Sequence, residues 1–264
     1  MTTFSRADWD ALLLDREVPQ ALQRAVDLGV MKAVFPELFA LVGFGGGRSG
    51  HKDLWVHTKL VVAQTPPSPA LRWAALFHDC GKPRCFSEDS AGISFHGHEV
   101  ASAQLFRRAA SREKLFTGDE VKRISGIIVM LGKVEQYDAQ WTDAAVRRLT
   151  KELGALAPDV LAVAQADCTS GKPEKRRAAV SRCQALAARI TELVKQDQIQ
   201  PALPHGLGTA VMERLGVDPG TMSREQAQEM KRIMGGLKAL VESGALPRSG
   251  AIEVYLEKLP SLLP

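Results

Sequence analysis

The sequence predicts an all-α protein, and three observations support this prediction. No segment of the 264 residues alternates strictly between β-branched and polar side chains, which is the pattern of a half-buried strand. Thr117-Gly-Asp-Glu120 and Ser223-Arg-Glu-Gln226 have the spacing of capping boxes, which mark the first turns of helices. The composition, 45% hydrophobic and 24% charged, is that of an ordinary globular chain that can bury a substantial core.

The expected helices follow one another along the chain, with prolines and glycines at their boundaries. The glycine-rich stretch Gly43–Gly50 is too pliant for the interior of an element, and the polar stretch Pro83–Phe95 is expected to be an irregular exposed loop. We expect helices over residues 4–14, 19–30, 53–64, 70–79, 98–115, 121–134, 142–153, 158–168, 173–196, 208–215 and 223–242. Within the third of these, helical spacing turns four side chains inward: Leu54, His57, Leu60 and Val61.

The loops divide the chain into three expected segments. These are an N-terminal helical segment (1–48), a central histidine-bearing bundle (49–198) and a C-terminal helical segment (199–264). No apolar run is long enough to span a bilayer, so no membrane association is expected. The first residues lack a secretory signal pattern, and the four cysteines show no Cys-x-x-Cys spacing, so the sequence predicts a cytoplasmic protein with reduced thiols. The net charge of +4 permits a phosphate-bearing ligand without demonstrating one.

Histidines gather in one part of the chain, and this pattern indicates a metal site. Five of the six lie between His51 and His98. The apolar run Trp73–Phe77 leads directly into an adjacent imidazole and carboxylate, His78 and Asp79, and burial of such groups is costly unless they have partners. A single histidine on an apolar face is more often a hydrogen-bonded core residue, but the combination of several favours a metal ion.

The candidate ligands come from separate helices. His57 lies on one expected helix, His78 and Asp79 end the next, and Asp167 ends a later and very apolar one. An unpartnered carboxylate at Asp167 would be expensive to bury, and either a metal or an ion pair would resolve that cost. Mixed imidazole and carboxylate ligation suits Mn, Ni, Co, Fe or Zn better than Ca.

The motif His57…His78-Asp79-Cys-Gly-Lys82…His96-Gly-His98-Glu99…Asp167 resembles the HD-domain superfamily of metal-dependent phosphohydrolases. More closely, the chain from about residue 10 to about 250 is similar to the C-terminal HD region of bacterial CCA-adding tRNA nucleotidyltransferases. The nucleotide-adding head of those enzymes, with its paired Asp-x-Asp carboxylates, has no counterpart in this sequence. The expected architecture is therefore an HD helical bundle flanked by short helical segments.

The resemblance implies roles for individual residues. His57, His78, Asp79 and Asp167 match the metal-binding positions, Lys82 matches a lysine that meets the phosphate, and His98 with Glu99 matches a Gly-His-Glu motif. His96 lies where the related enzymes vary and is a substrate-binding candidate together with Glu99 and Arg84. Relatives that bind two ions often carry a His-His pair where this chain reads Ile128-Val-Met-Leu131, so we expect one ion and leave a second open.

The resemblance implies hydrolysis of 2′,3′-cyclic phosphodiesters or phosphomonoesters on nucleotides or RNA ends. In this scheme Asp79 acts through the metal, Lys82 and Arg84 offset phosphate charge, and His98 protonates the leaving ribose oxygen.

Hydrolysis of a nucleoside triphosphate at the same site is a rival enzymatic function. The alternatives are a non-catalytic tRNA- or protein-binding helical module and the HD-bearing subunit of a split tRNA nucleotidyltransferase. Homo-oligomerisation is left open. Two groups of basic residues are candidates for tRNA contact. The first comprises Arg107, Arg108, Arg112 and Lys114, and the second comprises Lys172, Lys175, Arg176 and Arg177.

Overall fold

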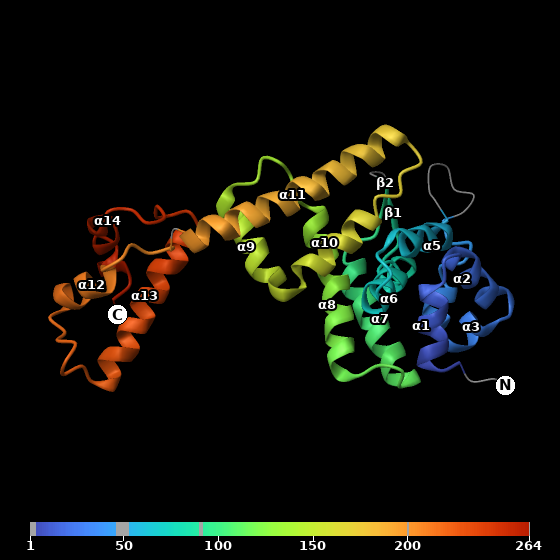
Figure 1. Cartoon of the computed structure of the whole chain (residues 1–264), viewed down its shortest axis with the longest axis horizontal. Helices are drawn as coiled ribbons and strands as arrows, with labels where there is room; N and C mark the ends of the chain where they lie inside the picture. The colour runs from blue at the N-terminus through green and yellow to red at the C-terminus, as the bar shows by residue number, and fades with distance from the viewer. Residues whose placement is uncertain (1–3, 46–52, 90–91, 200, 264) are drawn as a thin grey trace. The chain divides into compact units, whose positions relative to one another are not determined.

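The structure is a computed structural model that describes residues 4–45, 53–89, 92–199 and 201–263 (Figure 1). His51 and most of the Gly43–Gly50 stretch lie outside the described residues. In the described part of the chain, no helix is long and apolar enough to cross a bilayer.

The predicted all-α class is confirmed. The helices begin and end close to the expected residues, and the two predicted capping boxes are present at Thr117 and Ser223. The α-helices are α1 (Arg6–Leu14), α2 (Val18–Asp27), α3 (Val30–Val34), α4 (Pro36–Phe39), α5 (Leu54–Gln64), α6 (Pro69–Phe77), α7 (His98–Glu113), α8 (Gly118–Glu135), α9 (Asp143–Leu153), α10 (Ala157–Ala166), α11 (Pro173–Ile199), α12 (Leu207–Leu215), α13 (Arg224–Glu242) and α14 (Ile252–Leu256).

Two local expectations were wrong. The stretch 83–95 is not wholly irregular, because β1 (Ser87–Asp89) and β2 (Gly92–Ser94) form a small antiparallel hairpin in which Ser87 pairs with Ser94. Leu60 does not face inward, since 45% of its surface is exposed, whereas Val61 and Val62 are fully buried. The packed face of α5 is thus rotated by about one residue from the face that apolar spacing alone suggested.

The chain forms two compact units that interleave along the sequence. Residues 1–139 and 153–186 make up the first, and residues 140–152 and 187–264 make up the second. The HD segment expected over 49–198 contributes to both, and the three-segment division stays a prediction.

Helix α6 is the buried centre of the first unit. All its residues from Leu71 to Phe77 are buried, and α5, α8 and α10 pack against it. Aromatic rings extend from it in both directions, with ring centroids 5.5 Å apart for Phe35 and Phe77 and 5.2 Å apart for Phe77 and Phe106. Edge-to-face pairs of this kind add to the free energy of burial and restrict the helix to one orientation.

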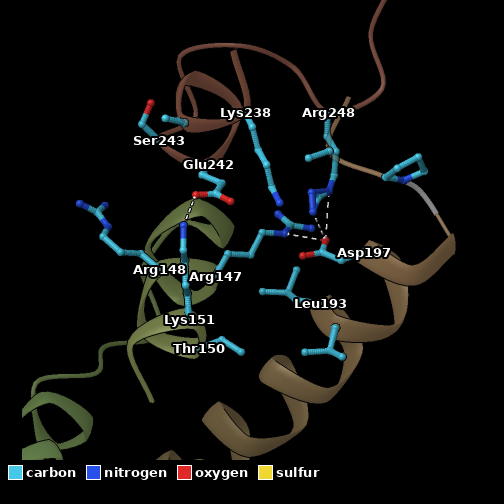
Figure 2. Close-up of a pocket in the computed structure, with 14 residues that line it drawn as sticks. Arg147, Arg148, Thr150, Lys151, Leu193, Asp197, Lys238, Glu242, Ser243 and Arg248 are labelled. Carbon is cyan, nitrogen blue, oxygen red and sulfur yellow. Dashed lines mark hydrogen bonds and ion pairs between the residues drawn. The ribbon is translucent and has the colours of Figure 1, made fainter. Parts of the chain in front are cut away.

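The second unit has its own apolar core, built from α12, α13 and the C-terminal residues. Leu207, Val211, Ile233, Leu237 and Tyr255 are fully buried there. Parts of α9, α11 and α13 in the same unit line a pocket (Figure 2).

Candidate metal centre

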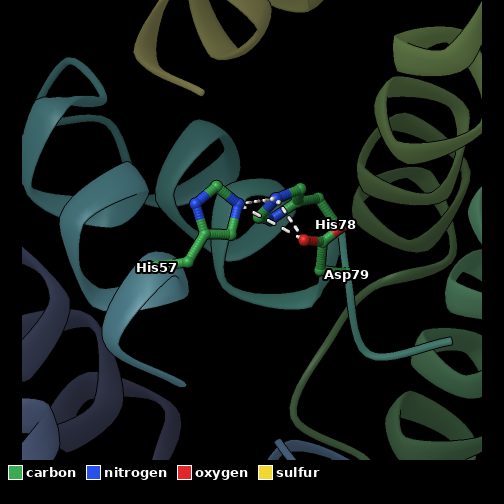
Figure 3. A group of neighbouring side chains, drawn as sticks. All are labelled: His57, His78 and Asp79. Carbon is green, nitrogen blue, oxygen red and sulfur yellow. Dashed lines mark hydrogen bonds and ion pairs between the residues drawn. The ribbon is translucent and has the colours of Figure 1, made fainter. Parts of the chain in front are cut away.

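Three ligand-type side chains converge at the end of the buried helix α6. His57, His78 and Asp79 each offer one ligand atom, and these atoms lie within 4.8 Å of one another (Figure 3). His57 Nε2 is 3.3 Å from both His78 Nε2 and Asp79 Oδ2. His78 Nε2 is also 3.3 Å from Asp79 Oδ2. The adjacency of His78 and Asp79 at the end of an apolar helix places both groups inside the first unit.

Asp167 completes the group from the end of α10. Its Oδ1 lies 3.0 Å from His57 Nε2 and 3.6 Å from His78 Nε2. This oxygen is buried and has no hydrogen-bond partner of good geometry, although the imidazole nitrogens are near. A buried carboxylate oxygen without a donor is costly, so the arrangement favours a cation or a protonated imidazole beside it.

A hydrogen bond to the backbone fixes the tautomer of neutral His78. His78 Nδ1 is 2.7 Å from the carbonyl oxygen of Ala75, which can only accept, so Nδ1 carries the proton. In the neutral ring Nε2 is then an acceptor, and it points at His57 and the carboxylates. A backbone carbonyl that holds the distal nitrogen is the usual support of a metal-ligating histidine.

Thr169 supports His57 in a similar way. Its hydroxyl oxygen lies 2.8 Å from His57 Nδ1, which leaves His57 Nε2 directed at Asp79 and Asp167. When the Thr169 hydroxyl accepts from His57 Nδ1, both neutral rings present an Nε2 lone pair to the two carboxylates. A divalent cation fits this donor set, and the residues match the ligands that transition metals take.

The electrostatics of the cluster also favour positive charge beside the two carboxylates. Burial lowers the pKa of His78, but Asp79 and Asp167 outweigh it and hold that pKa well above the usual value. His57 behaves likewise. Burial lowers its pKa, but Asp167 and Asp79 raise that pKa by more, so the net shift is upward. Burial raises the pKa of Asp79 and of Asp167, yet the neighbouring histidines bring both below the usual range. Two protonated imidazoles side by side repel, whereas one divalent ion can replace both protons.

The two oxygens of Asp79 have different partners. Lys82 Nζ donates to Oδ2 at 2.6 Å, on the oxygen that also faces the histidines. His98 Nε2 lies 3.4 Å from Oδ1. His98 begins α7 next to Gly81, where a Cβ would lie only 2.4 Å from the carbonyl oxygen of His98. The glycine of the His-Asp-Cys-Gly-Lys turn is therefore what allows α7 to approach Asp79.

A cavity of about 480 Å³ opens on the cluster, entirely within the first unit. His57, Lys82 and Asp167 line it, whereas His98 does not. Arg84 and His96 are exposed and also lie outside the lining. Glu99 is half-buried, with Oε2 3.5 Å from His98 Nδ1.

Sequence reasoning missed residues that face this cavity. Thr169 and Arg182 both line it, as does Glu135, whose pKa is raised by burial and by the nearby Asp167. The proximity of Thr169 to Asp167, two residues earlier, was the one sequence feature that could have indicated its place at the site. Arg182 is placed there only by the path of α11, and nothing in its sequence neighbourhood indicates a site. At the position of the His-His pair of two-ion relatives, Ile128 and Leu131 are buried core residues of α8.

Comparison with known proteins agrees with this geometry. Residues 65–169 match the family described as "HD domain". This range contains every proposed ligand except His57. The chain is 29% identical over 271 residues to the A-adding tRNA nucleotidyltransferase of Deinococcus radiodurans, covering 97% of this chain and 58% of that protein. It is 29% identical over 249 residues to the CC-adding tRNA nucleotidyltransferase of Thermus thermophilus, covering 92% of this chain and 52% of that protein.

A shorter match covers part of the same region. A multifunctional CCA protein of Azoarcus sp. is 37% identical over 95 residues, which is 33% of this chain and 22% of that protein. The chain spans somewhat more than half the length of the two relatives that it matches almost throughout. The chain therefore has an HD-domain match at residues 65–169 and is homologous over most of its length to bacterial tRNA nucleotidyltransferases.

Proposed function

We propose that the protein is a metal-dependent phosphohydrolase that acts on nucleotides or RNA ends, with 2′,3′-cyclic phosphodiesters as the leading substrates. The observation that supports this most strongly is the meeting of His57, His78, Asp79 and Asp167 beside a cavity that also holds Lys82. HD domains are metal-dependent hydrolase folds, and this ligand set would hold a transition-metal ion such as Mn, Ni, Co, Fe or Zn.

When bound, the ion would supply a Lewis acid that polarises a phosphoryl oxygen and makes water a better nucleophile. The other steps belong to the chain's own residues. His57, His78, Asp79 and Asp167 hold the ion at the cavity, and the Ala75 carbonyl and Thr169 orient the two rings. We propose one ion, because buried apolar side chains occupy the α8 position where two-ion relatives carry histidines.

Lys82 is the proposed phosphate-binding residue. Burial lowers the pKa of Lys82, but the adjacent Asp79 raises it above the usual value, so the ammonium group stays charged throughout the neutral range. It lines the cavity while it donates to Asp79, which places a fixed positive charge next to the ligand cluster. The exposed Arg182 lines the same cavity and adds a second cation for phosphate oxygens. Arg84, His96 and Glu99 stay substrate-binding predictions.

The position of His98 suggests that it orients Asp79. It is 3.4 Å from Asp79 Oδ1 and is absent from the cavity lining. Its proposed role as proton donor to the leaving ribose oxygen requires substrate to reach the far side of Asp79. The His98→Ala variant separates the two roles, because loss of a proton donor removes the alkaline limb of the pH–rate profile, whereas loss of an orienting group lowers metal affinity.

A metal-supplemented activity screen tests the proposal. Purified protein is assayed with Mn, Ni, Co or Mg against 2′,3′-cyclic AMP and a panel of nucleoside mono- and triphosphates. We expect hydrolysis of the cyclic phosphodiester with at least one transition metal. Asp79→Ala should lower the rate by about 1,000-fold or more, since it removes a ligand and the partner of Lys82.

The matched control is Asp119→Ala, which removes an exposed carboxylate on α8. It should keep the wild-type rate. Equal rates for Asp79→Ala and wild type would show that the activity does not come from this site. A rate confined to nucleoside triphosphates would keep the metal site but replace the substrate assignment.

A second candidate function is tRNA binding, either without turnover or as the HD-bearing part of a split tRNA nucleotidyltransferase. It is favoured by the similarity to tRNA nucleotidyltransferases and by exposed basic residues at and just before the start of α11: Lys172, Lys175, Arg176 and Arg177. Arg112 of the other basic group is held in a bidentate ion pair with Glu37 and is less available.

Titration of the protein with deacylated tRNA at several salt concentrations tests this candidate. Binding that weakens steeply with salt, and that is reduced in a Lys175→Glu/Arg176→Glu variant, would support it. Binding that is independent of salt would argue against it. Co-purification of a chain that bears a nucleotide-adding head would establish the split enzyme.

A further inference from the structure

The second unit contains a cavity that has no part in the metal centre. Its volume is about 730 Å³, within the range of small-molecule binding sites. It is lined by residues of α9, the last turns of α11 and the last turns of α13, together with the segment at Pro201 and Ala202 (Figure 2). All of these residues belong to one compact unit, so the cavity is a feature of that unit alone.

The charges in this cavity, which we call the α9–α13 cavity, are unbalanced. Five cationic side chains line it against two carboxylates. Asp197 Oδ1 accepts from Arg147 Nε at 2.9 Å and from Arg248 Nη2 at 2.7 Å, so one carboxylate holds two guanidinium groups. Because one negative charge cannot neutralise two positive ones, this group keeps a surplus positive charge.

The remaining cations increase the surplus. Lys151 pairs with Glu242 at 2.8 Å, and that pair is balanced. Arg148 and Lys238 are exposed and make no hydrogen bond or ion pair with the described residues. Figure 2 shows Lys238 directed toward the group of Arg147, Arg248 and Asp197. Asp197 thus fixes two guanidinium groups beside a free ammonium, which is an arrangement suited to several phosphate oxygens.

The cavity also has an apolar wall. Leu193 and Val194 of α11 line it with Pro201, Ala202 and Ala239, and 40% of the Val194 surface is exposed. An inorganic anion would leave this wall uncovered. A ligand that carries both an aromatic or aliphatic body and a strongly anionic end would satisfy both parts of the lining.

We propose that the α9–α13 cavity binds a nucleoside polyphosphate. The phosphates lie against Arg147, Arg248 and Lys238, and the nucleoside covers the apolar wall at Leu193 and Val194. This site is independent of the proposed hydrolase activity, because none of its lining residues belongs to the metal centre.

Calorimetric titration of the full chain with ATP tests the proposal, and EDTA in the buffer prevents metal-dependent binding at the HD site. We expect saturable binding of one ATP per chain. Sodium tripolyphosphate should bind at least about tenfold more weakly and adenosine not measurably, because each supplies only half of the contacts. Lys238→Glu should weaken ATP binding by about tenfold or more, since it reverses a charge within the site.

The matched control is Lys231→Glu, which changes an exposed lysine of the same helix outside the cavity and should leave the affinity within twofold. Arg148→Glu is a second variant in the cavity in case Lys238→Glu does not fold. The absence of saturable ATP binding, or equal binding by the cavity and control variants, would overturn the proposal. Equal affinity for ATP and tripolyphosphate would overturn the nucleoside part and leave an anion site.

Discussion

Each unit contains one cluster of carboxylates and nitrogen-bearing side chains. The two clusters differ in whether those nitrogens always carry a proton that they can donate in a hydrogen bond. In the second unit, Asp197 is bound by Arg147 and Arg248, whose guanidinium groups always carry protons. In the first unit, Asp79 and Asp167 face the Nε2 atoms of His57 and His78. Those atoms can carry either a proton or a lone pair, and the Ala75 carbonyl fixes the lone pair of neutral His78 toward the carboxylates.

The difference separates a carboxylate that already has permanent donors from a cluster that could hold a cation. Asp197 accepts from two guanidinium groups that are always protonated, and the cationic side chains that line its cavity outnumber the carboxylates. Asp167 Oδ1 is buried without a good donor, and Lys82 alone does not balance the two carboxylates unless a histidine binds a proton. A carboxylate paired with arginines therefore suits the proposed anion site in the second unit, whereas carboxylates paired with histidines suit the proposed metal site in the first. The following predictions test that comparison, from the largest expected effect to the smallest.

Asp167→Asn should weaken metal binding by about 100-fold or more, because an amide oxygen replaces a charged ligand. The measurement is the metal-dependent rise of the melting temperature across a titration with Mn or Ni. Asp159→Asn is the matched control, since Asp159 lies on the same helix and pairs with Arg123 away from the site. Identical metal dependence of the two variants would exclude Asp167 from the ligand set.

Metal affinity should fall as the pH is lowered. Asp79 and Asp167 raise the pKa values of His57 and His78 above the ordinary value of about 6.5, so protons compete with the metal even above that pH. Each proton displaced contributes about a tenfold change per pH unit. Competition with a chromophoric chelator at about pH 6, 7 and 8 measures the slope. A flat profile would show that the imidazoles do not exchange protons for the ion.

Thr169→Val should weaken metal binding by about tenfold, because His57 Nδ1 loses the hydroxyl that orients its ring. The measurement is again chelator competition. Thr58→Val is the matched control, since its buried hydroxyl bonds only to the Leu54 carbonyl within α5. If both variants kept wild-type affinity, Thr169 would have no orienting role.

Asp197→Asn should lower the free energy of unfolding by about 1 kcal/mol, since the partly exposed carboxylate holds Arg147 and Arg248 in place. Urea denaturation measures the change. Glu242→Gln should have a smaller effect, because its partner Lys151 is 73% exposed. Neither substitution should alter metal binding, and a change in metal affinity would contradict the separation of the two clusters.

Much of the fold and part of the site could be predicted from the sequence. Helix positions follow from apolar spacing and from caps such as Thr117 and Ser223, because these interactions reach only one turn along the chain. His78 and Asp79 could be found because they are adjacent and follow an apolar helix. His57 and Asp167 were predicted as ligands, and the structure brings both next to that pair.

What lies around these residues depends on how the helices pack, and sequence spacing does not contain that information. Leu60 was placed inward because it is apolar, yet the packing of α5 turns it outward. The proton-donor role of His98 stays a prediction, and the packing of α7 adds a contact with Asp79 Oδ1 that its sequence position does not reveal.

The sequence by itself determined the helices, the His-Asp pair and the candidate ligands, because these depend on local period and residue type. Only the tertiary structure decided that Thr169 holds His57, that Arg182 faces the metal centre's cavity and that Asp197 binds two arginines in the other unit. These contacts join helices far apart in the chain. Their atoms meet because buried side chains fix the helix–helix orientation, and no local pattern records that orientation.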